Sequence, residues 1–197
     1  MSLTQRKIFE VSSMKREIVA VFLLLSLCIP LTIEPVWAQP TWYLENSGIT
    51  SQLSGIDFLG DLGWVVGASG TIRRTYNAGK TWYAQSSGTT SYLYSIDMRS
   101  SGSTTKGWVV GTGGVIRHTA TGSSWTGQTS GTTASLFAVR FAADLLHGWI
   151  VGDTGTFLRT TNGGSSWAKI TVKYPFLWVT RTVVEPLRGL DFVTNDL

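Results

Sequence analysis

Short apolar runs recur along the chain, and each is bounded by a cluster of Gly, Ser, Thr or Asn residues. The runs are about five residues long, which favours β-strands joined by tight turns over helices. In the first well-defined stretch, we expect four strands at residues 53–58, 63–66, 71–75 and 81–85. The second of these contains WVV, which is apolar at every position and so predicts a strand buried on both faces.

The same pattern of apolar and polar positions occurs three times. The copies are GWVVGASGTIRRTYNAGKTW from Gly63, GWVVGTGGVIRHTATGSSW from Gly107 and GWIVGDTGTFLRTTNGGSSW from Gly148, which gives a period of about 42 residues. A four-stranded unit cannot bury both of its faces alone, so it must stack against copies of itself. We therefore predict an all-β protein, a β-propeller made of four-stranded blades.

The third turn of the module carries a motif of its own. TYNAGKTW and TTNGGSSW fit the pattern S/T-x-D/N-x-G-x-T/S-W, which resembles the Asp-box of bacterial neuraminidase (BNR) repeats, and the middle copy TATGSSW is one residue shorter. In such a turn the Asn bonds to nearby amides, the Gly adopts a positive φ and the Trp covers the turn. We expect a structural role for Thr75, Asn77, Gly79, Trp82, Thr160, Asn162, Gly164 and Trp167.

The N-terminal segment differs from the repeats. Lys15 and Arg16 precede an apolar run at residues 18–29, and Val36 and Ala38 stand where a signal peptidase requires small residues. This predicts a secretory signal peptide at residues 1–38, with an uncleaved N-terminal anchor as the alternative. Because the only cysteine, Cys28, lies within it, packing alone must hold the exported chain together.

The period divides the rest of the chain into blades. We expect a lone outer strand and turn at residues 39–52, blades at 53–92, 93–135 and 136–186, an inserted segment at 168–186, and the start of a further blade at 187–197. Propellers usually have about four to eight blades. About three blades therefore predict an incomplete, N-terminal portion of a ring, truncated at residue 197.

Composition and charge exclude several classes of function. The net charge is +4, but the basic residues are scattered singly, which argues against nucleic-acid binding. Neither histidine has a Cys, Asp or Glu partner at metal-ligand spacing, so we expect no metal and no cofactor. Asp57, Asp97 and Asp191 recur in one slot of the module, which favours a scaffold role over catalysis.

The whole pattern resembles the photosystem II assembly and stability factor family. The resemblance rests on the modules L-x-x-I-D-F … GWVVG-x-x-G-x-I-x-R-T-x-N-x-G-x-T-W, from about Thr41 to the end. It implies a non-catalytic scaffold in the thylakoid lumen that holds newly made reaction-centre protein. The partner would be a protein client, such as a membrane-protein segment of photosystem II. In a host without photosynthesis, the periplasm or the cell exterior is the alternative location, with membrane association only peripheral or through an uncleaved N-terminal segment.

The resemblance also implies an arginine-rich partner surface. The matching residues are Arg74 and Arg159, and strand alternation adds Arg73 and Arg117 on the opposite blade face. The structural alternative is that Arg74 and Arg159 bond the carbonyl groups of the Asp-box turn. Trp178 lies outside the repeat in KYPFLWV and is a candidate for a protein or membrane-surface contact, with a loop folded back on the blade as the alternative.

Two functions from other classes remain open. A sialidase-like glycosidase requires an arginine cluster for a carboxylate and two placed catalytic groups. A glycan-binding, cell-surface propeller would use Trp-rich loops as sugar platforms. Most of the nine tryptophans recur in repeat slots, so we expect them in the core instead.

Overall fold

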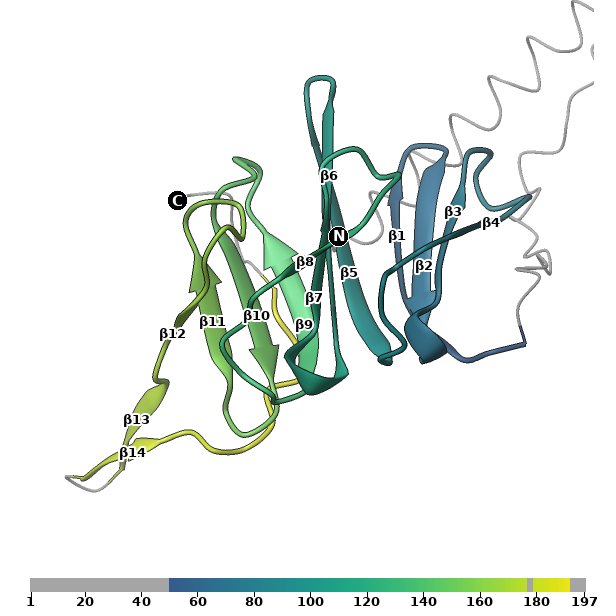
Figure 1. The fold of residues 1–197 in the computed structure, drawn as a ribbon. Helices are drawn as coiled ribbons and strands as arrows, with labels where there is room; N and C mark the ends of the chain where they lie inside the picture. The colour runs from purple at the N-terminus through teal and green to yellow at the C-terminus, as the bar shows by residue number, and fades with distance from the viewer. Residues whose placement is uncertain (1–49, 177–178, 192–197) are drawn as a thin grey trace, which may run out of the picture. The chain divides into compact units, whose positions relative to one another are not determined.

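The computed structural model describes residues 50–176 and 179–191, and these residues form an all-β fold (Figure 1). Three antiparallel four-stranded sheets follow one another along the chain, each with its strands in sequence order. The strands of the first sheet are β1 (Leu53–Leu59), β2 (Leu62–Gly67), β3 (Ile72–Thr75) and β4 (Tyr83–Gln85). All four of its predicted strands are present within one to two residues of their expected ends.

The second and third sheets repeat this arrangement. The second contains β5 (Leu93–Ser101), β6 (Thr104–Gly111), β7 (Ile116–Thr119) and β8 (Thr126–Gln128). The third contains β9 (Leu136–Phe141), β10 (Gly148–Gly152), β11 (Phe157–Thr160) and β12 (Ala168–Lys169). Short 3-10 turns, η1 (Ala68–Gly70) and η2 (Thr112–Gly114), join the second and third strands of the first two sheets.

The inserted segment forms a separate strand pair. β13 (Lys173–Phe176) and β14 (Val179–Thr182) make a two-stranded antiparallel hairpin. The chain then returns to the third sheet, where Leu187 N donates to Gly152 O at 2.9 Å. The predicted signal segment, most of the lone strand at 39–52, Trp178 and the end of the chain lie outside the described residues.

The sheets pack face to face, and the core lies between them. We call the face of a sheet that is turned toward the next sheet along the chain its forward face, and the opposite face its rear face. The forward face of the first sheet meets the rear face of the second in a cluster formed by Trp64, Val66, Ile72, Leu93, Ile96, Met98, Val109 and Trp125. Val109 of the second WVV strand is buried in this core, and Trp108 and Val110 of the same strand are buried on the forward face, so both faces are covered, as the sequence predicted.

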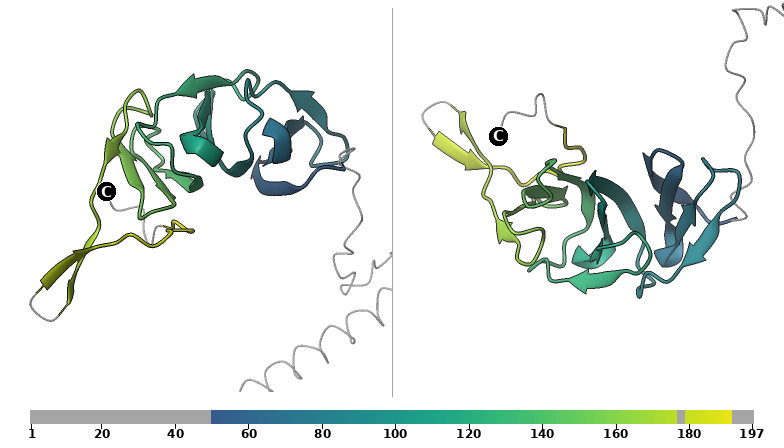
Figure 2. Two further views of the ribbon diagram at one scale, coloured as in Figure 1. Left: turned by 60° about the horizontal axis from the view of Figure 1, so that its bottom comes forward. Right: turned by 90° about the horizontal axis from the view of Figure 1, so that it is seen from above.

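A second, equivalent core joins the second and third sheets. Its buried residues are Trp108, Val110, Ile116, Leu136, Val139, Phe141, Leu145, Ile150 and Leu158. The first strands β1, β5 and β9 are neighbours across the two junctions (Figure 2). We call them the inner strands, because each begins its sheet and contacts the inner strand of the adjacent sheet. Among the described residues, no helix is long and apolar enough to cross a membrane.

Candidate functional site

The two full-length Asp-box turns have the same internal hydrogen bonds. Thr75 Oγ1 accepts from Asn77 N at 3.2 Å and from Gly79 N at 3.0 Å, and Asn77 Oδ1 accepts from Thr81 N at 3.0 Å. Gly79 has a φ of +93°, which a residue with a side chain rarely adopts. The turn satisfies its own polar groups, so its Thr and Asn are engaged in holding the backbone.

The third sheet repeats the arrangement. Thr160 Oγ1 accepts from Asn162 N and from Gly164 N, at 3.3 and 3.0 Å, and Asn162 Oδ1 accepts from Ser166 N at 3.0 Å. In the shorter middle turn, Thr119 Oγ1 accepts from Gly122 N at 2.8 Å. In the middle turn Thr121 stands near the place of the Asn, and its Oγ1 accepts from Ser123 N at 3.3 Å in place of the Asn bonds.

The second and third of these turns also bind the preceding sheet, each through one backbone carbonyl. Gly122 O accepts from Trp64 Nε1 at 2.9 Å, from Gln85 Nε2 at 2.9 Å and from Arg74 Nη1 at 3.2 Å. In return, Trp125 Nε1 donates to Gln85 Oε1 at 2.9 Å. We call this set of reciprocal bonds the intersheet clamp.

The intersheet clamp recurs between the second and third sheets with longer bonds. Gly163 O accepts from Trp108 Nε1 at 3.2 Å and from Gln128 Nε2 at 3.4 Å. Trp167 Nε1 donates to Gln128 Oε1 at 3.4 Å. The repeated tryptophans therefore align the sheets by hydrogen bonds at their indole nitrogens as well as by burial.

Arg74 belongs to the first intersheet clamp. Its side chain is buried, Nη1 also donates to Ser123 Oγ at 2.9 Å, and Cζ lies 4.9 Å from the centre of the Trp64 ring and 4.4 Å from that of Tyr76. The alternative expectation, that Arg74 bonds the carbonyl of an Asp-box turn, describes this geometry, although the turn belongs to the next module. Arg74 is thus held between two sheets.

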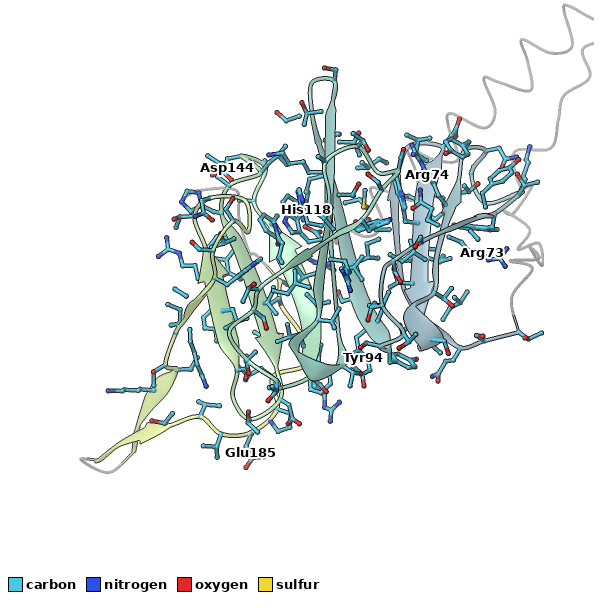
Figure 3. All side chains as sticks on the ribbon, in the orientation of Figure 1. Arg73, Arg74, Tyr94, His118, Asp144 and Glu185 are labelled. Carbon is cyan, nitrogen blue, oxygen red and sulfur yellow. The ribbon has the colours of Figure 1, made fainter. Side chains whose placement is uncertain are left out.

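The other candidate arginines lie on different surfaces. Arg73 is half-buried on the rear face of the first sheet, where Nη1 donates to Trp82 O at 3.5 Å, and Figure 3 shows it apart from Arg74. Arg117 Nη2 donates to Gly88 O at 2.6 Å, in the connection between the first two sheets. Arg159 is exposed on β11. The structure does not gather these side chains into one patch.

The repeated aspartates link the inner strands. Asp57 Oδ2 accepts from Met98 N at 2.6 Å, and Asp97 Oδ2 accepts from Phe141 N at 2.8 Å. Each carboxylate thus accepts a hydrogen bond from a backbone N–H of the next inner strand. That strand is the edge of its sheet, so this N–H has no partner strand on its open side. Burial raises the pKa of Asp97, against the lowering effect of its bonds to Arg99 and Phe141 N and of the charge of Arg140.

Arg140 interrupts the aspartate series. It stands in the third sheet where the first two sheets carry Asp57 and Asp97, and its Nη1 lies 3.7 Å from Asp97 Oδ1. Arg99 contacts the same carboxylate, with Nη2 3.0 Å from Oδ1 and Nε 3.0 Å from Oδ2. Two guanidinium groups therefore share one buried carboxylate.

A groove of about 820 Å³ runs beside the inner strands. We call it the inner-strand groove; its charged lining residues are Asp57, Asp97, Arg99, Arg140 and Arg188. Our sequence reasoning missed all three arginines because none recurs from module to module. The signal that could have found Arg140 is the change of charge in an otherwise acidic slot.

The two histidines have separate, local partners. Burial lowers the pKa of His118, which lies against Trp108 with ring centres 5.4 Å apart. His147 Nδ1 lies 2.5 Å from Asp144 Oδ2, and this bond holds the pKa of Asp144 at about 2. Within the described ranges, no group of three or more His, Cys, Asp or Glu side chains is placed to hold a metal ion.

The fold and the turns define the class of protein: the chain is built as blades of a BNR-repeat β-propeller. Residues 35–129 match the family model described as photosynthesis system II assembly factor YCF48. Over these residues, just under half of the chain, the protein is similar to this photosystem II assembly factor family of BNR-repeat propellers. A search of curated proteins finds no match.

Solved structures share the fold at low sequence identity. YCF48 bound to D1 peptide is 22% identical with a TM-score of 0.54, over 62% of this chain and 40% of that one. YCF48 from Cyanidioschyzon merolae is 23% identical with a TM-score of 0.51, over 60% and 39%. An ancestral GH74 enzyme is 14% identical with a TM-score of 0.51, over 64% and 19%. The chain thus spans about 40% of the length of the two YCF48 structures.

Proposed function

We propose that the chain is part of an exported, non-catalytic scaffold that binds a protein client of photosystem II during assembly. The observation that carries the proposal is the family match over residues 35–129, together with a fold shared with a YCF48 that is bound to D1 peptide. Thylakoid lumen is the location that fits this role, with the periplasm as the alternative in a host without photosynthesis. The predicted signal segment at residues 1–38 supports export.

A non-catalytic role is supported by how the repeated acids are used. Glycosidases need two carboxyl groups that face the substrate. Asp57 and Asp97 both accept hydrogen bonds from backbone amides, and Asp97 also carries two arginine contacts. The likeness to the GH74 enzyme is a likeness of fold alone, because the two chains are only 14% identical.

The client-contact residues that we propose, called the client surface below, are Arg159, Arg73, Arg117 and Trp178; the three arginines lie on different faces and do not form one patch. Arg159 is the most accessible arginine of this set, and Arg73 and Arg117 lie on rear faces. Arg74 acts differently, because its guanidinium is buried in the intersheet clamp. Exposed arginines suit acidic segments, since a guanidinium pairs with a carboxylate through two parallel hydrogen bonds.

A binding assay with D1 peptide tests the proposal. We expect labelled peptide to raise its fluorescence anisotropy when the full chain is added, and a scrambled peptide of the same composition to bind at least 10-fold more weakly. Arg159→Glu should weaken binding, whereas Lys80→Glu, the same charge change in an exposed turn, should not. Equal binding of the native and scrambled peptides would refute client recognition.

A further inference from the structure

The inner-strand groove has a surplus of positive charge. Its lining contains three arginines and two aspartates. Both aspartates accept hydrogen bonds from backbone amides, and Asp97 is only 2% exposed, so Asp97 is not presented to a ligand. The side chains of Arg99 and Arg140 are 37% and 40% exposed, so both are partly open to solvent although both contact Asp97.

Arg188 adds a third guanidinium from another segment. Its Cζ lies 5.0 Å from the centre of the Phe137 ring. Across the described residues, Arg188 forms no ion pair within 4 Å, and Asp153 is an acidic residue that lines an adjoining pocket with it. A cation held on an aromatic face and open to a groove is well placed to bind an anion.

The rest of the lining offers aromatic rings and hydroxyl groups. Tyr94 and Phe137 meet edge to face with ring centres 5.2 Å apart, and Tyr94 lies at the lower end of β5 in Figure 3. Ser54, Ser95 and Ser100 lie along the same groove. Pockets for small ligands have volumes of about 300–1,000 Å³ and combine apolar walls with a few polar groups. The groove has the size of such a pocket, and its lining is more polar than apolar, which suits a polar ligand.

From these features, we propose that the inner-strand groove binds a small sugar acid, whose carboxylate pairs with Arg140 and Arg188. The hydroxyl groups of the sugar would bond to the serines, and its ring would lie against Tyr94 and Phe137. Binding without hydrolysis is expected, because Asp57 and Asp97 accept hydrogen bonds from backbone amides and Asp97 also contacts two arginines. This site is separate from the proposed client surface and does not depend on it.

Galacturonate and galactose form a matched pair of probes, because they differ only in the carboxylate. By titration calorimetry on the full chain, we expect galacturonate to bind at least 10-fold more tightly than galactose. Arg188→Gln removes the guanidinium that lies over the Phe137 ring and should weaken galacturonate binding about 10-fold or more, since a charge-assisted hydrogen bond is lost. Arg140→Gln should act in the same direction.

Controls separate charge loss from misfolding and from the proposed client role. Arg159→Gln removes an arginine that lies in the third sheet but outside the groove, so it should leave galacturonate binding unchanged. Each variant should also have the same denaturation midpoint as the unsubstituted protein, within error, which shows that it is folded. Equal binding of the two sugars, or unchanged galacturonate binding in Arg188→Gln, would overturn the proposal. Displacement of galacturonate from the groove by an acidic peptide would also overturn the sugar-acid proposal. D1-peptide binding, measured on the same variants, tests the client proposal separately.

Discussion

Gln85 and Gln128 occupy the same slot in successive sheets, so the chain contains a matched pair for testing the intersheet clamp. Gln85 donates to Gly122 O and accepts from Trp125 Nε1, both at 2.9 Å. Replacing Gln85 with Leu keeps a side chain of similar size but removes both bonds. Gly122 O keeps two other donors, whereas the Trp125 indole N–H loses its acceptor in a nearly buried position.

The expected cost follows from these contacts. A net hydrogen bond contributes about 0.5–1.5 kcal/mol, and a buried donor left without an acceptor costs about 1–3 kcal/mol. We therefore expect Gln85→Leu to lower the free energy of unfolding by about 2 kcal/mol. Gln128 makes the same two bonds at 3.4 Å, and its partner Trp167 is only partly buried, so Gln128→Leu should cost less than about 1 kcal/mol.

Urea denaturation of the full chain, followed by tryptophan fluorescence, measures both changes. A double-mutant cycle of Gln85→Leu with Trp125→Phe should show a coupling energy of about 0.5–1.5 kcal/mol, because the two residues share one hydrogen bond. Equal losses for the two glutamines, or additive effects in the cycle, would refute the idea that the clamp stabilises the stack of sheets.

Three further predictions concern a turn, a titration and a buried cation. Gly70→Ala should prevent stable folding, because the new Cβ would lie 1.9 Å from Thr89 O. Gly60 has a similar positive φ but no atom within 4 Å of a new Cβ, so Gly60→Ala should lower the free energy of unfolding by only about 1–2 kcal/mol. Thermal melts of the two variants test the difference. The pKa of Asp144, measured by NMR titration, should be about 2. Because this pKa lies below that of Asp144 in the unfolded chain, ionised Asp144 stabilises the fold above about pH 4, and this stabilisation is lost as the pH falls toward 2. His147→Asn should move the Asp144 pKa back up. Arg74→Met should lower the free energy of unfolding by about 1–3 kcal/mol in urea melts, because Gly122 O and Ser123 Oγ lose a charged donor. If this variant lost peptide binding at unchanged stability, the structural role of Arg74 would be contradicted.

The fold was predictable because the repeat shows the same constraints three times. WVV and WIV indicate a strand covered on both sides, and Val66, Val110 and Ile150 are indeed buried in cores between neighbouring sheets. The turns were predictable because their polar groups are satisfied within seven or eight residues of sequence. The strand pair β13–β14 was expected only as a loop or a strand pair, since its sequence follows no period.

The partners of repeated side chains could not be predicted from one module. Arg74 is adjacent in sequence to its own Asp-box turn, yet its guanidinium bonds to Gly122 and Ser123 of the next module. Periodicity gives the face on which a side chain lies, but the contact depends on how far each sheet is rotated against its neighbour. For the same reason, the inner-strand groove could not be predicted from the sequence, because its lining comes from three sheets and from the segment after the hairpin.

A slot that is structural in two modules is free to serve another purpose in the third. Asp57 and Asp97 each pair an edge amide of the next inner strand, and a neutral or basic residue at either position would leave that amide without its acceptor. Arg140 occupies the same slot, but its side chain turns back to Asp97 and adds positive charge to the groove. The exchange of Asp for Arg therefore removes one intersheet bond and creates the charge surplus that a sugar acid would use. Arg140→Asp tests this exchange directly, because it restores the repeated aspartate and replaces a positive charge in the groove by a negative one.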